Sequence, residues 1–206
     1  MKRLYEVSPR LVARIAGILY LLSILMGVAA MVLSSRGMQI QGDKANLIAG
    51  VFYTGLTVLL WYLFHPVNKW ISAVAAIFSF AGCWFPPSFY RMAHIGSFTF
   101  FGAYCLLIGY LIVQSQFFPR AVGVLMGCAG VCWLIISWPY LDHALSPFPM
   151  IVGMVGEGTF MVYLLVRGPD ERQWRERDRC RSVSSSPNTS PWLKFNPAGW
   201  RPSPKS

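Results

Sequence analysis

One acidic residue, Glu157, lies near the middle of an apolar stretch that covers residues 148–166. A charged side chain at the centre of a bilayer costs roughly 2.5–3.5 kcal/mol on insertion scales, and loss of water favours the neutral form of a carboxyl group. The sequence therefore predicts that Glu157 points into a helical bundle, not at lipid. Two roles remain open for its carboxyl group. It binds a proton, a cation or a substrate, or it forms a structural hydrogen bond to a neighbouring helix.

Partners for Glu157 must come from other apolar stretches. The candidates offer a side-chain hydroxyl or a backbone group: Tyr20, Ser23, Tyr53, Thr54 and Thr57. The sequence does not choose among them. Gly156 and Gly158 flank the glutamate and would let another helix approach closely. No second carboxyl group lies within an apolar stretch, so no catalytic acid/base pair is indicated around Glu157.

A second polar set is predicted to gather at the outer mouth of the bundle. It consists of Arg91, His94, Asp142 and His143. Histidine and carboxylate side chains are zinc ligands, so one interpretation is a metal site, which would support an intramembrane enzyme. The favoured interpretation is a polar rim wetted by interfacial water, because the 48 residues between His94 and Asp142 fix no geometry. We expect no metal and no cofactor.

Compact catalytic motifs are missing from the sequence. Gly-rich phosphate loops, a GxSxG elbow, HExxH and CxxC are all absent, which makes an enzyme the less favoured class. Four of the five cysteines lie in apolar stretches, where a free thiol behaves as a small hydrophobe: Cys83, Cys105, Cys128 and Cys132.

The composition indicates a membrane protein. The chain has 206 residues, of which 55% are hydrophobic and 13% charged, against roughly 25% charged in a soluble domain. So few charges exclude a water-soluble globular enzyme, a disordered protein and a disulfide-rich secreted module. The net charge is +10 at pH 7, but the basic residues lie at both ends and in short loops, as membrane topology requires. We therefore expect the lipid bilayer as partner and no nucleic acid.

Six apolar stretches approach the roughly 20 residues that a helix needs to cross a bilayer. They predict an all-α fold, a bundle of six transmembrane helices with short loops. The third stretch is the shortest because Pro86 and Pro87 end it. The predicted spans cover residues 15–33, 45–64, 70–85, 96–113, 121–138 and 148–166.

These spans divide the chain into an N-terminal segment (1–14), a transmembrane domain (15–167) and a tail (168–206). An even number of spans places both termini on one side. Before Arg167, six Lys and Arg residues lie on that side and three on the other, and the segment from Arg167 onward adds nine. The positive-inside rule therefore places both termini in the cytoplasm.

The tail is predicted to have two parts. Charges alternate from Asp170 to Arg181 and indicate a short helix, whereas Ser, Pro and Asn dominate from Ser182 onward and indicate disorder. A solvated tail is favoured. The alternative is contact with anionic lipid headgroups through its arginines, which are Arg172, Arg175, Arg177, Arg179 and Arg181.

Small residues recur four positions apart on two of the spans. They are Gly123 and Gly127 on the fifth, and Ser23 and Gly27 on the first. Small residues at this spacing let helix backbones touch inside a membrane. Packing within one bundle is favoured, and a homo-oligomer formed through Gly123 and Gly127 is the alternative.

Several short motifs follow one another in a characteristic order. They are RIAGILYLL (14–22), LFHPVNK (63–69), HIG (94–96) with FFG (100–102) and LIGYLI (107–112), FPR (118–120) with GVL (123–125) and AG (129–130), and GE (156–157) with LLVRG (164–168). Together they resemble a bacterial family of multi-spanning membrane proteins of unknown function, DUF4386. The chain departs from that family in a shorter interval between the first and fourth spans, in lacking charged residues in the third, and in its tail. The resemblance implies an integral protein of the bacterial cytoplasmic membrane and implies no known activity.

Three functions therefore compete. The favoured one is a helical bundle with a packing or interaction role. The second is a small transporter or ligand-binding bundle that uses Glu157, and a polar cavity reaching that residue would favour it. The third is an intramembrane enzyme with its polar site at the outer mouth.

Overall fold

A computed structural model describes residues 8–85 and 97–184 of the chain, and every regular element within these ranges is a helix. The expected all-α fold class is thereby confirmed for the described residues. The helices are α1 (Pro9–Ser35), α2 (Gln39–Phe64), α3 (Lys69–Trp84), α5 (Ser97–Ser115), α6 (Arg120–Ile136), α7 (Pro139–Leu145), α8 (Phe148–Val166) and α9 (Glu171–Ser184).

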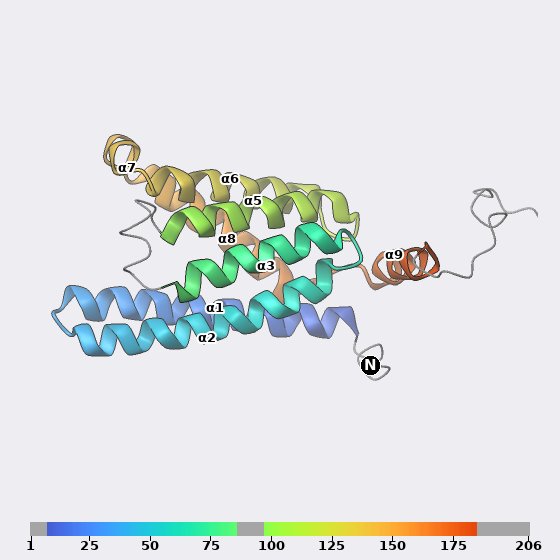
Figure 1. Ribbon diagram of the computed structural model, residues 1–206, viewed down its shortest axis with the longest axis horizontal. Coiled ribbons are helices and arrows are strands. Elements are labelled where there is room, and N and C mark those ends of the chain that lie inside the picture. Colours follow the sequence, from blue (N-terminus) through green and yellow to red (C-terminus); the bar gives the residue numbers. More distant parts are fainter. Residues whose placement is uncertain (1–7, 86–96, 185–206) are drawn as a thin grey trace, which may run out of the picture.

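Six long helices form a closed ring. Each packs on the next in the order α1, α2, α3, α5, α6 and α8, and α8 packs back on α1. Figure 1 shows α1 paired with α2 along one side, α5 paired with α6 along the other, and α8 behind them. The start of α1, the end of α8 and all of α9 lie at the same end of the bundle.

Each long helix corresponds to one predicted span. Helix α3 has the 16 residues expected of the shortest span, whereas α6 ends at Ile136, before the predicted end of the fifth span. By length and composition, four helices could each cross a membrane, or five if α6 and α7, which are bent by 114° at their junction, form one span. At about 1.5 Å per residue, the 16 residues of α3 and the 17 of α6 extend roughly 24–26 Å, below the ~30 Å of a hydrocarbon core. Pro139 begins α7 in a new direction, so it ends the predicted fifth span early.

The turn between α2 and α3 shows how the sequence places a helix boundary. Pro66 cannot donate a backbone hydrogen bond and follows the last turn of α2. The side chain of Asn68 then accepts hydrogen bonds from the backbone N–H groups of Trp70 and Ile71, at 3.1 and 3.2 Å. This N-cap begins α3, and the two helices run back along each other.

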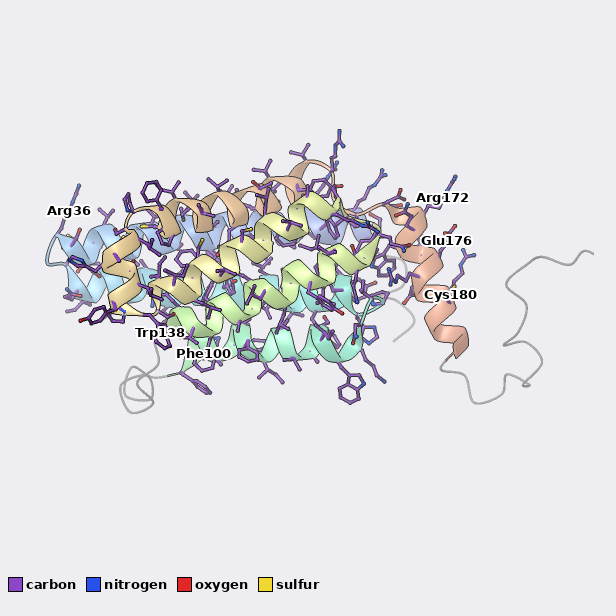
Figure 2. The ribbon with its side chains drawn as sticks, turned by 90° about the horizontal axis from the view of Figure 1, so that it is seen from above. Arg36, Phe100, Trp138, Arg172, Glu176 and Cys180 are labelled. Carbon is purple, nitrogen blue, oxygen red and sulfur yellow. The ribbon has the colours of Figure 1, made fainter. Side chains whose placement is uncertain are left out.

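Apolar side chains cover the outside of the ring as well as its interior. Figure 2 shows carbon-rich side chains projecting outward along the whole length of the bundle. Each long helix exposes large apolar residues, among them Ile18, Val51, Ile77, Phe98, Val124 and Val155. An apolar surface of this extent is not stable in water but matches lipid. The described helices therefore mark the chain as a membrane protein.

Close packing of α5 on α6 depends on glycine. A Cβ atom added at Gly123 would lie 2.8 Å from the carbonyl oxygen of Gly109, and one at Gly109 would lie 2.8 Å from the backbone N of Gly127. The favoured interpretation of the repeated glycines, packing within the bundle, agrees with these contacts. Assembly of two chains through Gly123 and Gly127 stays a prediction.

Helix α9 is the short helix expected after the Gly168-Pro169 turn, and it docks on the end of the ring. The buried indole of Trp174 donates from Nε1 to the carbonyl oxygen of Leu63, at 2.9 Å, in the last turn of α2. Arg177 donates from Nη1 to the carbonyl oxygens of Gln114 and Ser115, at 2.6 and 3.1 Å, at the end of α5. Disorder is predicted from Ser182 onward, but α9 continues to Ser184, so its predicted start is wrong by three residues. The rest of the tail lies outside the described residues.

Candidate functional site

Glu157 lies halfway along α8 and points into the ring, with 6% of its surface exposed. Three donors from three other helices contact its carboxyl group. The hydroxyl of Tyr20 on α1 donates to Oε2 at 2.8 Å. The indole Nε1 of Trp133 on α6 donates to Oε1 at 2.5 Å, and the thiol of Cys105 on α5 donates to the same oxygen at 3.7 Å. The inward orientation expected from the cost of a lipid-facing carboxyl group is therefore observed.

Two glycines on α8 bring Trp133 within reach of Glu157. A Cβ atom at Gly156 would lie 2.5 Å from the carbonyl oxygen of Leu125, and one at Gly153 would lie 3.2 Å from the Trp133 ring. Helix α6 can therefore lie directly against α8. The Trp133 ring is fixed on its other side by Phe98, with ring centroids 5.3 Å apart and planes 7° apart. Gly158 has nothing within 4 Å of an added Cβ, so the expectation that it also allows close helix approach is wrong.

Aromatic rings surround the carboxyl group on the side of α1, α2 and α5. Tyr20 contacts the edge of Tyr53 at 6.0 Å between centroids, and Tyr53 contacts Tyr104 at 5.8 Å. The hydroxyls of Tyr53 and Tyr104 are buried, and neither has a hydrogen-bond partner of good geometry among the described residues. Unpaired buried polar groups cost about 1–3 kcal/mol each. We call Glu157, Tyr20, Tyr53, Tyr104, Cys105 and Trp133 the glutamate cluster.

The donor pattern limits which carboxyl oxygen can carry a proton. An indole N–H only donates, so Oε1 must accept from Trp133. A tyrosine hydroxyl both donates and accepts, which leaves Oε2, opposite Tyr20, as the oxygen able to hold a proton. The three groups that contact the carboxyl are uncharged donors, with no cation among them. A proton on Oε2 would therefore remove the cost of an uncompensated charge at mid-bilayer depth.

Of the five candidate partners, the structure selects Tyr20. The Tyr53 hydroxyl has no partner of good geometry among the described residues, and the other three hydroxyls join neighbouring helices. Ser23 donates to the carbonyl oxygen of Ala49 at 3.2 Å, and Thr54 accepts from Trp84 Nε1 at 2.9 Å. Thr57 donates to the carbonyl oxygen of Tyr53 at 2.8 Å and also pairs with Ser79 on α3.

Sequence reasoning missed Trp133 and Cys105 as partners of the glutamate. One signal for Trp133 was present, because an indole N–H inside an apolar span needs an acceptor, and Glu157 is the one carboxyl group inside the six predicted spans. Cys105 carried no comparable signal, since a buried thiol is unremarkable in an apolar core.

The predicted outer-mouth set is only partly described. Arg91 and His94 lie outside the described residues. Asp142 and His143 lie on the short helix α7, where Asp142 is half-buried and His143 is exposed. Within the described ranges, no three His, Cys, Asp or Glu side chains are grouped closely enough to hold a metal ion. A shared site for the four residues stays a prediction.

Two open surface pockets in the described part of the chain do not include Glu157. One, of about 270 Å³, lies between α2 and α3 and includes Asp43, Asn46 and Trp84 in its lining. The other, of about 350 Å³, lies where α1 begins and α8 ends. The glutamate cluster is instead packed among the side chains of the ring interior.

Comparisons with known proteins agree with the resemblance seen in the sequence. Residues 88–168 match the family described as "Domain of unknown function (DUF4386)", so the resemblance is confirmed over this segment. The segment includes four members of the glutamate cluster, Tyr104, Cys105, Trp133 and Glu157, whereas Tyr20 and Tyr53 precede it. An uncharacterized protein from Archaeoglobus fulgidus is 27% identical over 125 residues, which cover 55% of this chain and 75% of that protein. No solved structure matches the chain.

Proposed function

We propose that this chain is a six-span membrane protein whose ring of helices acts as a packed interaction scaffold, with both termini in the cytoplasm of a bacterial cell. One observation carries the proposal. The one buried carboxyl group among the described residues, that of Glu157, is bound on both oxygens by donors from α1, α5 and α6. A carboxyl group held in this way joins four helices, since Glu157 itself belongs to α8.

The closed ring supports six spans although α3 and α6 are short. Each of the two fills a place between longer neighbours, and the ring would open to lipid without it. Trp70 and Trp84 lie at opposite ends of α3 and are exposed, as expected for aromatic residues at the two membrane interfaces. Short helices are tolerated by local bilayer thinning and by long basic side chains at their ends, and Lys69 begins α3.

The distribution of charge supports cytoplasmic termini. The end of the bundle that carries α9 also carries the basic residues Arg10, Arg14, Lys69, Arg120 and Arg167. The opposite end of the described part has Arg36 and Lys44. This bias has the sign that the positive-inside rule requires.

The satisfied carboxyl group favours a scaffold over a transport pathway. A transport site must exchange its proton, ion or substrate with water, and so it needs a polar path to one surface. Both oxygens of Glu157 have partners, the side chain is 6% exposed, and the two surface pockets of the described part do not reach it.

Proton flux in vesicles tests this proposal. The full chain is reconstituted into liposomes that contain a pH-sensitive dye, and a pH step is applied outside. We expect the rate of internal acidification to equal that of protein-free liposomes and that of liposomes with the Glu157→Gln variant. A faster rate for the unmodified chain that the Glu157→Gln variant abolishes would contradict the scaffold role and establish proton transfer through Glu157.

A second candidate function, binding of a small hydrogen-bonding ligand beside Glu157, is favoured by the buried hydroxyls of Tyr53 and Tyr104, which have no hydrogen-bond partner of good geometry among the described residues. The variants Tyr53→Phe and Tyr104→Phe separate the two functions. If the rings serve packing alone, removing an unpaired buried hydroxyl should leave thermal stability in detergent unchanged or raise it. If the hydroxyls contact a ligand that co-purifies with the chain, both variants should lose that ligand in native mass spectrometry and become less stable.

A further inference from the structure

A basic pocket of about 350 Å³ lies at the end of the ring where α1 begins and α8 ends. Its volume is within the range of roughly 300–1,000 Å³ that is usual for small-ligand sites. Three of its lining residues are arginines, and one is acidic. The pocket is lined by Arg10, Arg14, Tyr163, Val166, Arg167, Gly168, Pro169 and Asp170.

The chain builds this pocket through local backbone geometry. Arg10 and Arg14 are four residues apart on α1 and so lie on one face of that helix. Gly168 adopts φ +65°, a conformation that favours glycine, and its N–H donates to the carbonyl oxygen of Tyr163 at 2.9 Å. An added Cβ at Gly168 would lie 3.3 Å from Ala13. This close contact with α1 brings Arg167 beside the other two arginines.

The acidic residues near the pocket do not compensate most of its positive charge. Asp170 accepts hydrogen bonds at Oδ1 from the backbone N–H groups of Arg172 and Gln173, at 2.9 and 3.4 Å. Its carboxylate is thus engaged by the first turn of α9. Arg10 approaches Glu171 only to 4.0 Å. The guanidinium groups of Arg14 and Arg167 form no ion pair with any residue that the structure describes.

The surroundings of the pocket distinguish a lipid from a soluble anion. Leu11 and Ile15 on α1, and Val162 and Val166 on α8, are exposed apolar residues next to the arginines. An anion bound in the pocket would have its charged end among guanidinium groups and would have exposed apolar residues of α1 and α8 beside it. A phospholipid has this arrangement, whereas inorganic phosphate does not.

We propose that Arg10, Arg14 and Arg167 form a binding site for the phosphate group of an anionic phospholipid, with the acyl chains lying along α1 and α8. Arginine suits this role because its planar fork of donors pairs with phosphate oxygens in a bidentate manner. Basic pockets between helices on the cytoplasmic side of a membrane are a recurrent form of headgroup recognition. The inference rests on the proposed placement of this end of the bundle at a membrane surface.

Lipid binding is measured on the full chain in a neutral detergent by native mass spectrometry. Phosphatidylglycerol is titrated in one series and phosphatidylcholine with the same acyl chains in another. We expect phosphatidylglycerol to bind more tightly. One basic residue near the headgroup is worth about 1 kcal/mol, so Arg14→Gln and Arg167→Gln should each weaken phosphatidylglycerol binding by about fivefold, and the double variant by about 25-fold.

A matched control removes the same charge outside the pocket. Arg120 is an exposed arginine at the same end of the bundle and is not part of the pocket lining, so Arg120→Gln should leave the affinity for phosphatidylglycerol unchanged. Arg14→Lys keeps the charge without the planar fork and should retain intermediate affinity. Thermal unfolding of each variant confirms that it folds.

Three results would overturn the proposal. They are equal affinity for the two lipids, an effect of Arg120→Gln as large as that of Arg14→Gln, and displacement of the lipid by millimolar inorganic phosphate, which would identify a soluble anion as the ligand. Because binding is measured in detergent, the result does not depend on which side of the membrane the termini face. Failure of lipid binding and failure of the proposed topology are therefore separate outcomes.

Discussion

The groups around residue 157 can form the same hydrogen bonds with a protonated glutamate and with a glutamine. Trp133 needs an acceptor at one position, and Tyr20 can either donate or accept at the other. A glutamine would offer its carbonyl oxygen to the indole and its amide N–H to the tyrosine hydroxyl. A leucine of similar size would offer nothing to either group.

We predict that Glu157→Gln is nearly neutral for stability and that Glu157→Leu is destabilising. The leucine variant leaves the buried Tyr20 hydroxyl and the part-buried Trp133 N–H without a partner, at a cost of up to about 1–3 kcal/mol each. Thermal unfolding in detergent measures both variants. Adding Trp133→Phe to Glu157→Leu should recover part of the loss, since it removes one of the unpaired groups. If Glu157→Gln and Glu157→Leu lose the same amount of thermal stability, the hydrogen bonds do not hold the carboxyl group.

The orientation of Glu157 was predictable from the sequence, but most of its partners were not. The cost of a carboxyl group in lipid depends on that residue alone, so it can be read from one apolar stretch. The identity of a partner depends on the rotation and depth of a facing helix. These follow from contacts such as that of Gly156 with Leu125, which no single stretch reveals.

At the scale of helices, glycine determines which pairs can approach closely. Gly123 and Gly127 belong to the same sequence pattern, but their surroundings differ. An added Cβ at Gly123 would meet Val113 at 2.7 Å and the carbonyl oxygen of Gly109 at 2.8 Å, whereas at Gly127 nothing lies within 4 Å.

We therefore predict that Gly123→Ala destabilises the chain by roughly 1–3 kcal/mol, the usual cost of overpacking. Gly127→Ala is the matched control and should be neutral or slightly stabilising, because alanine is the better helix former. Thermal unfolding compares the two variants. If the pattern instead joins two chains, both substitutions should shift the oligomeric state in size-exclusion chromatography with light scattering.

Helix α9 should depend on Trp174 for its docking. Trp174→Ala removes a buried ring that packs on Tyr62, at 5.8 Å between centroids, together with the hydrogen bond to Leu63. We expect a loss of about 2–4 kcal/mol, near the lower end of large core truncations, and faster proteolysis of the segment after Gly168. The control is Gln173→Ala, at the neighbouring exposed residue. It should change neither the stability nor the rate of proteolysis. Unchanged proteolysis of Trp174→Ala would mean that other contacts hold α9.

The helices could be located from the sequence better than their ends. The predicted sixth span coincides with α8, because proline and polar residues bound it on both sides. The predicted fifth span runs two residues past the end of α6, where Pro139 redirects the chain into α7. Apolarity continues through that bend at Trp138 and Tyr140, so hydropathy alone does not reveal it.

For the whole molecule, the proposed topology places the two ends of the bundle on opposite sides of the membrane. Reporter fusions at Gly168, after α8, and at Ala144, within α7, sample the two ends of the bundle. We expect a cytoplasmic signal at Gly168 and the opposite signal at Ala144, because α8 separates them and the basic residues gather at the first. The same signal at both sites would show that α8 does not cross the membrane, and exchanged signals would reverse the orientation.

The central claim is that the glutamate cluster is a dry, packed junction, and Cys105 reports on it directly. Its thiol lies 3.7 Å from Glu157 and has 0% of its surface exposed, whereas Cys180 on α9 is exposed to solvent. The full chain in lipid nanodiscs is treated with a small, water-soluble methanethiosulfonate, and each cysteine is followed by peptide mass spectrometry. We predict rapid modification of Cys180 and none of Cys105 until the chain is denatured. Modification of Cys105 at a rate comparable to that of Cys180 would show that water reaches Glu157 and would contradict the scaffold.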